Sequence, residues 1–282
     1  MKKLVIVTTV SDLRARVSDW RAGGVRIGLV PTMGALHEGH LSLVREMAGR
    51  AERVIVSIFV NPTQFAPHED FARYPRTLEA DCTKLAGEGA ADLVFAPSAA
   101  EMYPDGFATK IEVGGPAEGL ESDFRPHFFA GVATVVSKLL IAAMPDLAIF
   151  GEKDYQQLLV IKRVVADLGL PIEILGGATM READGLAMSS RNAYLDAGER
   201  KIAGQLNVIL RDVKHRLRVS EDIAAAEAFA RKALLEAGFS SVDYVAIRDA
   251  QTLKKIEHLS APARILAAAK IGNTRLIDNM SV

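Results

Sequence analysis

The chain has 282 residues, of which 49% are hydrophobic and 24% are charged, and its formal net charge at pH 7 is −1. This balance is typical of a globular protein and excludes a largely disordered chain, which would carry fewer apolar residues and more net charge. A nearly neutral chain also lacks the basic surplus of a protein built to coat nucleic acid, so we expect small-molecule partners and no nucleic acid.

The first residues, Met-Lys-Lys followed by a short apolar run, faintly resemble a signal peptide. The run is too short, and the polar residues Ser11 and Asp12 follow it at once, so a first β-strand is predicted instead. No apolar stretch approaches the ~20 residues that span a membrane, and no membrane partner is expected. Cys82 is the only cysteine. It allows no intrachain disulfide, favours a reducing cytoplasm, and is more typical of a small buried residue than of a nucleophile.

Short runs of β-branched residues alternate with helical patterns through residues 4–175. Several runs are apolar at consecutive positions, which is typical of strands buried on both faces of a parallel sheet. The alternation predicts an α/β domain with a doubly wound, Rossmann-like parallel sheet. The predicted strands are 4–8, 25–30, 54–60, 93–96, 147–150 and 172–175, and the predicted helices are 11–21, 39–51, 77–89, 131–143 and 155–168.

A smaller α+β unit is predicted at the C-terminal end, after a plausible hinge at Gly176 and Gly177. The predicted domains are therefore 1–177 and 178–282. Within the second domain, helices are predicted at 201–218 and 223–238, and strands at 242–248 and 264–270. The long segment 97–128 in the first domain shows little periodicity, and we expect a functional loop or a small hairpin there.

Polar and glycine-rich peptides follow three of the predicted strands. They are Pro31-Thr-Met-Gly-Ala-Leu-His-Glu-Gly-His40, Asn61-Pro-Thr-Gln-Phe65 and Gly151-Glu-Lys-Asp-Tyr-Gln-Gln157. In doubly wound sheets, ligands bind at the carboxyl ends of the strands. The three peptides therefore predict a common binding site.

His37 and His40 lie three residues apart at the start of a predicted helix. A helix N-terminus offers free N–H groups and a positive dipole end, which suit phosphate, and Gly34 and Gly39 let the backbone approach a ligand closely. Imidazolium donors would stabilise charge on phosphoryl oxygens as pyrophosphate leaves. Two alternatives are a pair of helix-capping histidines and a zinc site, although no third and fourth zinc ligands stand at sensible spacing.

Ser189, Ser190 and Arg191 combine two hydroxyls and a guanidinium in a compact phosphate clamp. Such a string also occurs by chance, most often as a solvated turn. Together with the histidine pair, it becomes the expected second half of an ATP site, closing over the triphosphate from the smaller domain.

The segment 151–154 ends a predicted strand, and Asp154 is a natural helix N-cap. Its functional interpretation is contact between the nucleotide and the backbone, Lys153 or Asp154. Gln157 projects one turn later, and Gln64 ends a different strand. Two amides in one pocket suit a substrate with hydroxyl and carboxylate groups.

With these motifs in order, the chain resembles the pantoate–β-alanine ligase family, within the nucleotidylyltransferases that carry a His-x-Gly-His signature. The similarity covers essentially the whole chain. It includes the three peptides above, the segment Arg73-Tyr-Pro-Arg-Thr77, residues 181–192 and the tail Arg275-Leu-Ile-Asp-Asn279.

The resemblance implies a two-step ligase reaction in pantothenate biosynthesis. Pantoate carboxylate attacks the α-phosphate of Mg²⁺-ATP to give pantoyl adenylate and pyrophosphate, and the amine of β-alanine then displaces AMP. The family also implies a cytoplasmic homodimer.

The resemblance also implies roles for single residues. His40 would be the proton donor, with His37 stabilising phosphates beside it. Gln64 and Gln157 would hold pantoate, with Gln64 also near β-alanine, and Arg125 would lie close to the substrates. The implied ATP-binding residues are Met33, Gly34, Ala35, Leu36, His37, Glu38, Gly39, His40, Gly151, Glu152, Lys153, Asp154, Met180, Met188, Ser189, Ser190 and Arg191.

The chain departs from the family pattern at two places. The family has a histidine where this chain has Phe128, and His127 stands one position early. Thr63 also stands where the family often has methionine, which we expect to be a tolerated change in the pocket wall.

Three other functions fit parts of the pattern. A nucleotidylyltransferase for a phosphorylated acceptor would need a basic acceptor pocket, where two glutamines are predicted instead. A tRNA-charging enzyme would need an extended basic surface. A nucleotide-binding regulator without activity would have no use for Gln64, Gln157 and Arg125 beside the ATP site.

Overall fold

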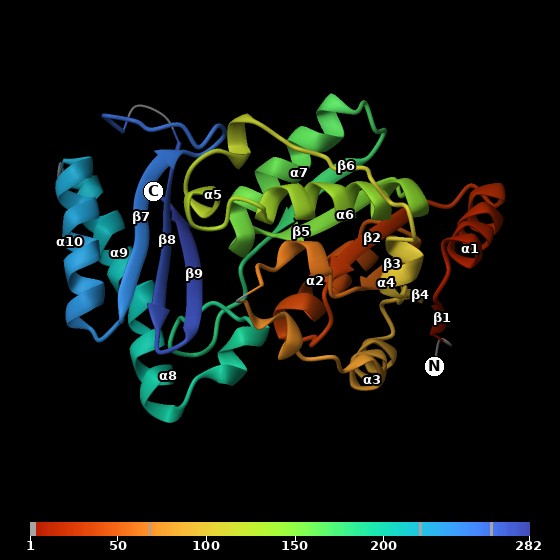
Figure 1. The fold of residues 1–282 in the computed structure, drawn as a ribbon, viewed down its shortest axis with the longest axis horizontal. Helices are drawn as coiled ribbons and strands as arrows, with labels where there is room; N and C mark the ends of the chain where they lie inside the picture. The colour runs from red at the N-terminus through yellow and green to blue at the C-terminus, as the bar shows by residue number, and fades with distance from the viewer. Residues whose placement is uncertain (1–3, 68, 220–221, 260–261) are drawn as a thin grey trace.

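The computed structural model describes residues 4–67, 69–219, 222–259 and 262–282 (Figure 1). Its first part is built on a six-stranded parallel sheet in the order β1-β4-β3-β2-β5-β6. All six predicted strands of the doubly wound sheet are confirmed. The strands are β1 (Val5–Val7), β2 (Ile27–Thr32), β3 (Arg53–Ile58), β4 (Leu93–Phe95), β5 (Leu147–Gly151) and β6 (Glu173–Gly177).

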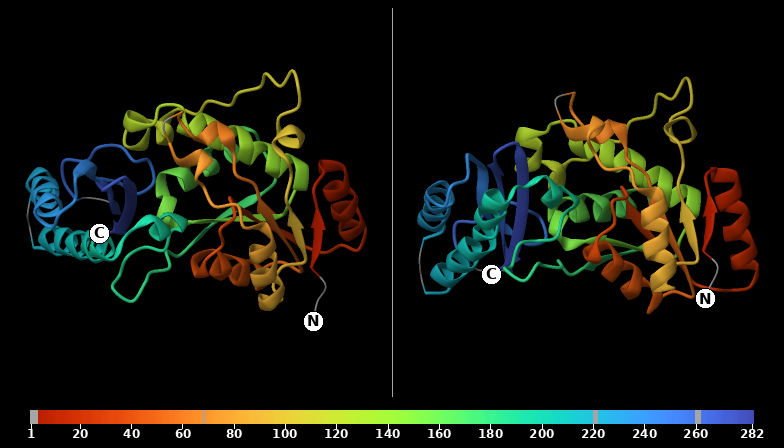
Figure 2. Two further views of the ribbon diagram at one scale, coloured as in Figure 1. Left: turned by 60° about the horizontal axis from the view of Figure 1, so that its bottom comes forward. Right: turned by 90° about the horizontal axis from the view of Figure 1, so that it is seen from below.

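Consecutive residues of the central strands enter different cores, which explains their unbroken apolar runs. In β2, Leu29 packs into the core beneath α1, α6 and α7, whereas Val30 packs into the core beneath α2 and α3. Helices therefore cover both faces of the sheet, as a doubly wound fold requires (Figure 2). The helices that cover the two faces are α1 (Val10–Ala22), α2 (Glu38–Ala48), α3 (Leu78–Glu88), α6 (Phe128–Ala143) and α7 (Tyr155–Asp167).

The strand order reverses between β2 and β5. After β2 the chain continues on one side to β3, whereas β5 pairs with β2 on the other side and continues to β6. Ligands of doubly wound folds bind outside the carboxyl ends of the strands at such a switch point. The peptides that follow β2 and β5, with the histidine pair and Gly151–Asp154, both start there.

The segment 97–128 contains short helical turns and no hairpin. These are α4 (Ala99–Met102), the 3-10 turn η3 (Gly115–Ala117) and α5 (Glu121–Phe124). Gln156 fixes part of this segment, because its buried amide accepts from the Glu121 N–H and donates to the carbonyls of Pro116 and Gly119. Gln156 thereby attaches η3 and the start of α5 to α7.

The C-terminal part folds around a three-stranded antiparallel sheet in the order β7-β8-β9. α9 and α10 lie on its outer side, and its other side faces the six-stranded unit (Figure 1). The predicted α+β character is confirmed. The elements are α8 (Ala197–Ala203), α9 (Gln205–Arg218), α10 (Ile223–Glu236), β7 (Ser241–Asp249), β8 (Ala263–Ile271) and β9 (Thr274–Ser281).

One expectation for this part was wrong, and one strand was missed. The single helix predicted at 201–218 is two helices separated at Gly204, and the first begins earlier because Asp196 and Glu199 form a capping box. β9 was not predicted as a strand. It pairs with β8 over its length, so its stability comes from a partner strand that local periodicity does not reveal.

Gly176 and Gly177 are the last two residues of β6 and pack tightly. A Cβ added at Gly177 would lie 2.1 Å from Leu43 Cδ2, and one at Gly176 would lie 2.9 Å from Leu158 Cδ2. Close packing thus accounts for both glycines, and a domain boundary at 177/178 stays a prediction. Among the described residues, no helix combines the length and apolar character that crossing a bilayer requires.

Candidate active site

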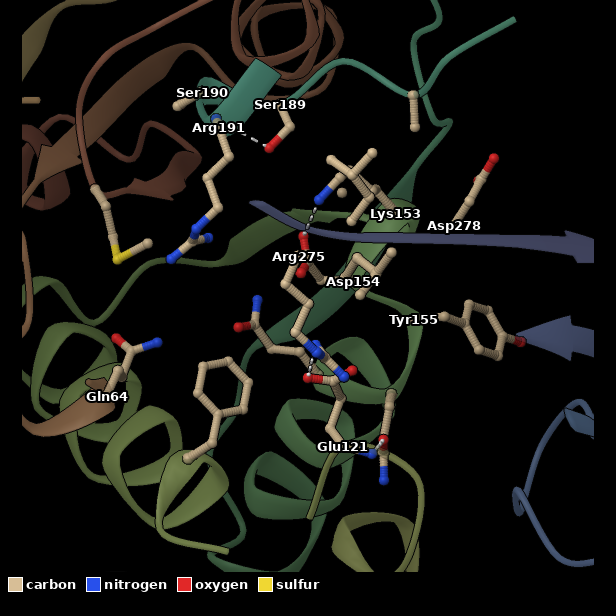
Figure 3. A pocket seen from close by; sticks show the side chains of 18 of the residues that line it. Gln64, Glu121, Lys153, Asp154, Tyr155, Ser189, Ser190, Arg191, Arg275 and Asp278 are labelled. Carbon is tan, nitrogen blue, oxygen red and sulfur yellow. Dashed lines mark hydrogen bonds and ion pairs between the residues drawn. The ribbon is translucent and has the colours of Figure 1, made fainter. Parts of the chain in front are cut away.

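A cavity of about 680 Å³ opens at the carboxyl ends of β2 and β5 and extends to the C-terminal sheet. Figure 3 shows side chains reaching into it from both parts of the chain. The cavity brings together most of the residues predicted for the site. Those that line it are Met33, His37, Gly39, His40, Gln64, Arg125, Gly151, Lys153, Asp154, Gln157, Met180, Met188, Ser189, Ser190 and Arg191.

The other five predicted residues do not line the cavity. Leu36 is 2% exposed and packs in the core, and Gly34 and Ala35 form the turn before the histidines with positive φ angles. The Glu38 carboxylate faces Arg45, and the Glu152 carboxylate accepts from Arg264. Contact with ATP stays a prediction for each of them.

The two histidines cap α2 and point their remaining donors outward. His37 Nδ1 accepts a hydrogen bond from the Gly39 N–H at 3.1 Å, and His40 Nδ1 accepts from the His37 N–H at 3.3 Å. The capping interpretation and the ligand interpretation are thus compatible, because each neutral ring carries its proton on Nε2, away from the cap. The ring centroids lie 4.1 Å apart, so the two Nε2–H donors form one compact group.

Both histidines have lowered pKa values in this setting. Burial, together with Lys153 and Lys84, lowers the pKa of His37 to about 4. Burial, His37 and the same two lysines lower the pKa of His40 to about 3. The rings are therefore neutral at pH 7, in contrast to the imidazolium form expected from the sequence. They act as N–H donors, and the two lysines supply the positive charge.

A buried carboxylate that the sequence did not indicate positions this turn. Asp81 of α3 is 0% exposed and accepts hydrogen bonds from the backbone N–H groups of Ala35 and Leu36. Lys84, one turn further along α3, donates to the Leu36 carbonyl at 2.6 Å. No local pattern distinguishes Asp81 from the other acidic residues of a solvated helix, so this role follows only from tertiary structure.

The loop after β5 is held from the C-terminal sheet. The Asn279 amide donates to the carbonyls of Glu152 and Lys153 at 2.9 and 2.8 Å. Arg264 pairs with Glu152 and also donates to Asn279 Oδ1. Lys153 is thereby fixed at the cavity wall with its side chain 21% exposed.

The segment 188–191 reaches across the cavity to the first part of the chain. The Ser190 hydroxyl donates to the Ala35 carbonyl at 3.1 Å, and Ser189 Oγ accepts from the Arg191 N–H. Arg191 donates from Nε and Nη2 to the two oxygens of Asp70, both at 3.0 Å. The predicted clamp is thus brought beside the histidine turn, with Arg191 oriented by a carboxylate that sequence reasoning missed.

The two glutamines occupy the predicted pocket with different supports. Gln64 lies in the 3-10 turn η1 (Pro62–Gln64), and its Oε1 accepts from the Asn61 amide at 3.0 Å. The Tyr103 hydroxyl in turn donates to Asn61 Oδ1 at 2.7 Å. Gln157 lines the cavity from α7. Asn61 and Tyr103 were not predicted as site residues.

Arg125 lies at the edge of the pocket and is tightly paired. Its Nε and Nη2 atoms donate to Glu69 at 2.6 and 2.9 Å, and Nη2 also donates to the Gln64 carbonyl. The Phe128 ring stacks on the guanidinium, with 3.9 Å between Arg125 Cζ and the ring centroid. Phe128 lines the cavity and His127 does not, so the aromatic ring stands at the pocket where the resemblance led us to expect a histidine.

An open parallel sheet with a polar cavity at its switch point, capped by a second unit, is the architecture of an α/β nucleotide-binding protein. Comparison with known proteins narrows this class. A sequence model of the pantoate-beta-alanine ligase family matches residues 5–281. The chain therefore belongs to the pantoate–β-alanine ligase family, an ATP-dependent group of enzymes.

Similar proteins support this membership along the whole chain. A pantothenate synthetase of Mesorhizobium japonicum is 56% identical, covering 100% of this chain and 99% of its own length. One from Rhodospirillum rubrum is 53% identical, covering 100% of both.

Solved structures give the same result for the fold. A Thermus thermophilus pantothenate synthetase has a TM-score of 0.92 at 45% identity over 99% of both chains. A Francisella tularensis pantoate–β-alanine ligase complexed with beta-gamma ATP and β-alanine has a TM-score of 0.84 at 35% identity, covering 99% of this chain and 97% of its own.

Proposed function

We propose that this chain condenses pantoate with β-alanine through pantoyl adenylate, and that ATP binds where β2 and β5 diverge. In the first step a pantoate oxygen bonds to the α-phosphorus and pyrophosphate leaves. In the second, the β-alanine nitrogen bonds to the acyl carbon, and AMP leaves with the electrons of the C–O bond. One observation carries the proposal: His37, His40, Lys153, Ser190 and Arg191 share one cavity with two glutamines.

The histidines and Lys153 have different roles at the phosphates. We assign the two Nε2–H groups to phosphoryl oxygens, where fixed donors stabilise the charge that builds as pyrophosphate leaves. The lysine supplies the positive charge that the neutral rings lack. A bound phosphate anion would raise the pKa values of both rings, since an opposite charge favours the protonated form. His40 is then able to donate a proton to the departing group.

The pantoate pocket combines two amides with an apolar wall. Gln64 and Gln157 offer donors and acceptors for the carboxylate and hydroxyl groups. Apolar side chains beside them suit the two methyl groups of pantoate and exclude water from the adenylate. This wall consists of Phe59, Phe129, Val132, Val135, Val136 and Leu139.

Arg125 supports this pocket through Gln64. Its Nη2 atom donates to the Gln64 carbonyl at 3.2 Å while Glu69 holds the guanidinium from the other side. Because both of its strongest hydrogen bonds go to Glu69, we assign Arg125 to fixing the Gln64 turn beside the substrates.

Mg²⁺ fits this site as a partner of the ATP phosphates. Among the described residues no group of three or more His, Cys, Asp or Glu side chains could hold a metal ion alone. Mg²⁺ commonly binds one carboxylate and several phosphate oxygens, and Asp154 lines the cavity beside Lys153. We propose that Asp154 is this carboxylate. When bound, the ion neutralises charge on the phosphates.

The proposal extends to the setting of the enzyme. ATP is a cytoplasmic metabolite, so we place the reaction in the cytoplasm. We also propose a homodimer, on the resemblance to the family alone.

Isotope exchange tests the first step directly. Labelled pyrophosphate should enter ATP in the presence of pantoate and the absence of β-alanine. Exchange that requires a phosphorylated acceptor would instead favour a nucleotidylyltransferase of a different substrate class. Exchange unaffected by pantoate would contradict the proposal altogether.

A further inference from the structure

The C-terminal sheet forms a wall of the cavity that the assigned roles leave unused. Two consecutive residues of β7, the turn before β9 and the first residues of β9 line it, facing α5. Figure 3 shows Arg275 entering the pocket beside Glu121, on a different side from Gln64. The polar residues of this wall are Asp243, Tyr244, Lys270, Asn273, Thr274, Arg275 and, from α5, Glu121.

A β-bulge builds this wall. The register of β7 against β8 shifts between Val242 and Tyr244. Successive residues of a regular strand point to opposite faces, but a bulge re-aims a side chain. Asp243 and Tyr244 consequently both line the cavity, and both bond to the same cluster.

Arg275 is the centre of this cluster. Its Nη1 donates to Glu121 Oε2 at 2.8 Å and its Nε donates to Asp243 Oδ2 at 2.7 Å. The Tyr244 hydroxyl donates to the other oxygen of Glu121 at 2.7 Å. The guanidinium is therefore fixed on two edges, and its side chain is 19% exposed.

The third guanidinium nitrogen of Arg275, Nη2, is not paired in the way that Nε and Nη1 are. Nη2 is buried, and among the described residues it has no hydrogen-bond partner. An unpaired buried donor on a charged group is unfavourable, and a role in binding a ligand would explain why the structure keeps one. The ligand must offer an acceptor, and a carboxylate is the strongest match for a guanidinium.

The charges around Nη2 restrict the ligand further. Arg275, Lys270 and Arg125 are positive, the last with its Nη1 3.7 Å from Glu121 Oε2, whereas Glu121, Asp243 and the Arg125 partner Glu69 are negative. The carboxylates repel a multiply charged anion such as phosphate, and they favour a ligand that also carries an ammonium group. A zwitterionic amino acid fits this balance.

We propose that Arg275 binds the carboxylate of the amino-acid substrate and that this wall is the acceptor subsite. The inference rests on the proposed function, because only a carboxylate–amine ligase uses such an acceptor. The short two-carbon spacer of β-alanine would then direct its amine from the wall toward the acyl group held beside Gln64 and Gln157. The first part of the chain would bind the acid and ATP for adenylation, and the C-terminal part would bind the substrate that carries the amine.

Full-length Arg275→Gln tests the proposal with two amines. β-Alanine and 3-aminopropan-1-ol differ in the carboxylate that Arg275 would bind. AMP release is measured with each amine, after exchange of pyrophosphate has established the concentration of working sites. A lost hydrogen bond to a charged group corresponds to about 1.5–3 kcal/mol, or roughly 10- to 150-fold. We expect kcat/KM for β-alanine, normalised to exchange, to fall by that factor while the value for the amino alcohol stays level.

Arg264→Gln is the matched control. Arg264 also joins the C-terminal sheet to the first part of the chain, through Glu152 and Asn279, but it does not line the cavity. Arg264→Gln should lower the melting temperature without changing the preference for β-alanine over the amino alcohol.

The outcomes separate this inference from the proposed function. An Arg275→Gln enzyme that keeps the wild-type preference, or loses activity equally with both amines, overturns the acceptor subsite. If the wild-type protein shows no pantoate-dependent exchange, the proposed function itself fails, whatever the variants do.

Discussion

Asp81 Oδ1 accepts a hydrogen bond of 2.8 Å from the backbone N–H of Leu36, the residue directly before His37. Its other oxygen accepts from the Ala35 N–H at 2.9 Å and from the Thr77 hydroxyl. One buried side chain thus satisfies the donors of a strained turn, in which Ala35 has a φ of 50°. This carboxylate holds the backbone directly before His37, although it touches neither histidine ring.

Asp81→Asn should destabilise the protein and weaken ATP binding. An amide leaves one backbone N–H of the turn facing its own NH₂ group, and an unsatisfied buried donor costs about 1–3 kcal/mol. Chemical denaturation would measure the stability, and the exchange reaction would measure the KM for ATP. Glu79→Gln, at an exposed position of the same helix, should change stability by less than about 0.5 kcal/mol. Equal effects of the two variants would contradict the positioning role.

His40→Asn should separate capping from chemistry. The Asn side-chain oxygen can replace Nδ1 as the acceptor of the His37 N–H, but it offers no Nε2–H to a phosphate. Folding should stay intact, and the adenylation rate should fall by roughly 10²–10³, the scale for one lost charge-stabilising group. His40→Ala should lose the same rate and also the hydrogen bond from the His37 N–H to Nδ1, which contributes about 0.5–1.5 kcal/mol to stability. Single-turnover adenylation at the wild-type rate in His40→Asn would refute the catalytic role.

The lowered pKa values of the histidines predict an acid-sensitive fold. In the unfolded chain both rings titrate near 6.5, whereas in the folded chain burial and the nearby lysines lower the pKa values to about 4 and about 3. Below pH 6.5 the unfolded state therefore binds more protons, and stability falls as the pH falls toward 4. His40→Asn removes one of these sites. It should lose less stability than the wild type between pH 7 and about pH 5 in denaturation curves, and identical losses would argue against the shift.

The sequence predicted the parallel sheet well, but it did not predict the side chains that hold the turns of the site. Both outcomes have one physical reason. Strands buried on both faces, such as 54–60, and glycine-rich turns, such as the one before His37, leave local patterns. Asp81 looks like an ordinary polar residue, and the motifs that contain Asn61 and Arg275 do not show which side chains these two residues contact. Each acquires its role from a partner that folding brings from a distant part of the chain, and no local pattern records that partner.

The same limit explains the errors in the C-terminal part. Arg275-Leu-Ile-Asp-Asn279 stood out as a motif, but not as a strand, because β9 has polar Asp278 and Asn279 at buried positions. These residues hold Arg181 and the loop after β5. Their burial follows from pairing with distant groups, which hydrophobic periodicity does not capture.

Tyr103→Phe should weaken the binding of pantoate without weakening that of ATP. The Tyr103 hydroxyl fixes Asn61, and Asn61 fixes the Oε1 atom of Gln64. Losing one hydrogen bond of this chain corresponds to about 0.5–1.5 kcal/mol, or roughly 2- to 13-fold in affinity. Exchange kinetics would give both KM values from one preparation. A parallel rise in the KM for ATP would indicate a general loss of structure instead.

Gly131→Ala should destabilise the protein, although alanine is the better helix former. In an ordinary helix this substitution stabilises by roughly 0.5–1 kcal/mol. Gly131 lies in α6, where a Cβ would stand 2.5 Å from the Thr63 carbonyl oxygen and 3.1 Å from the Gln64 nitrogen. Both contacts are backbone atoms, so the turn that carries Gln64 has to move.

Gly87→Ala is the matched substitution in α3, where a Cβ would meet nothing within 4 Å. It should raise the free energy of unfolding, while Gly131→Ala lowers it and also raises the KM for pantoate. The sign of the change in the free energy of unfolding decides the question, because helix propensity alone predicts the same sign for both variants. If Gly131→Ala stabilised the protein as Gly87→Ala does, then α6 and the Gln64 turn would not be in the close contact on which the pantoate pocket depends.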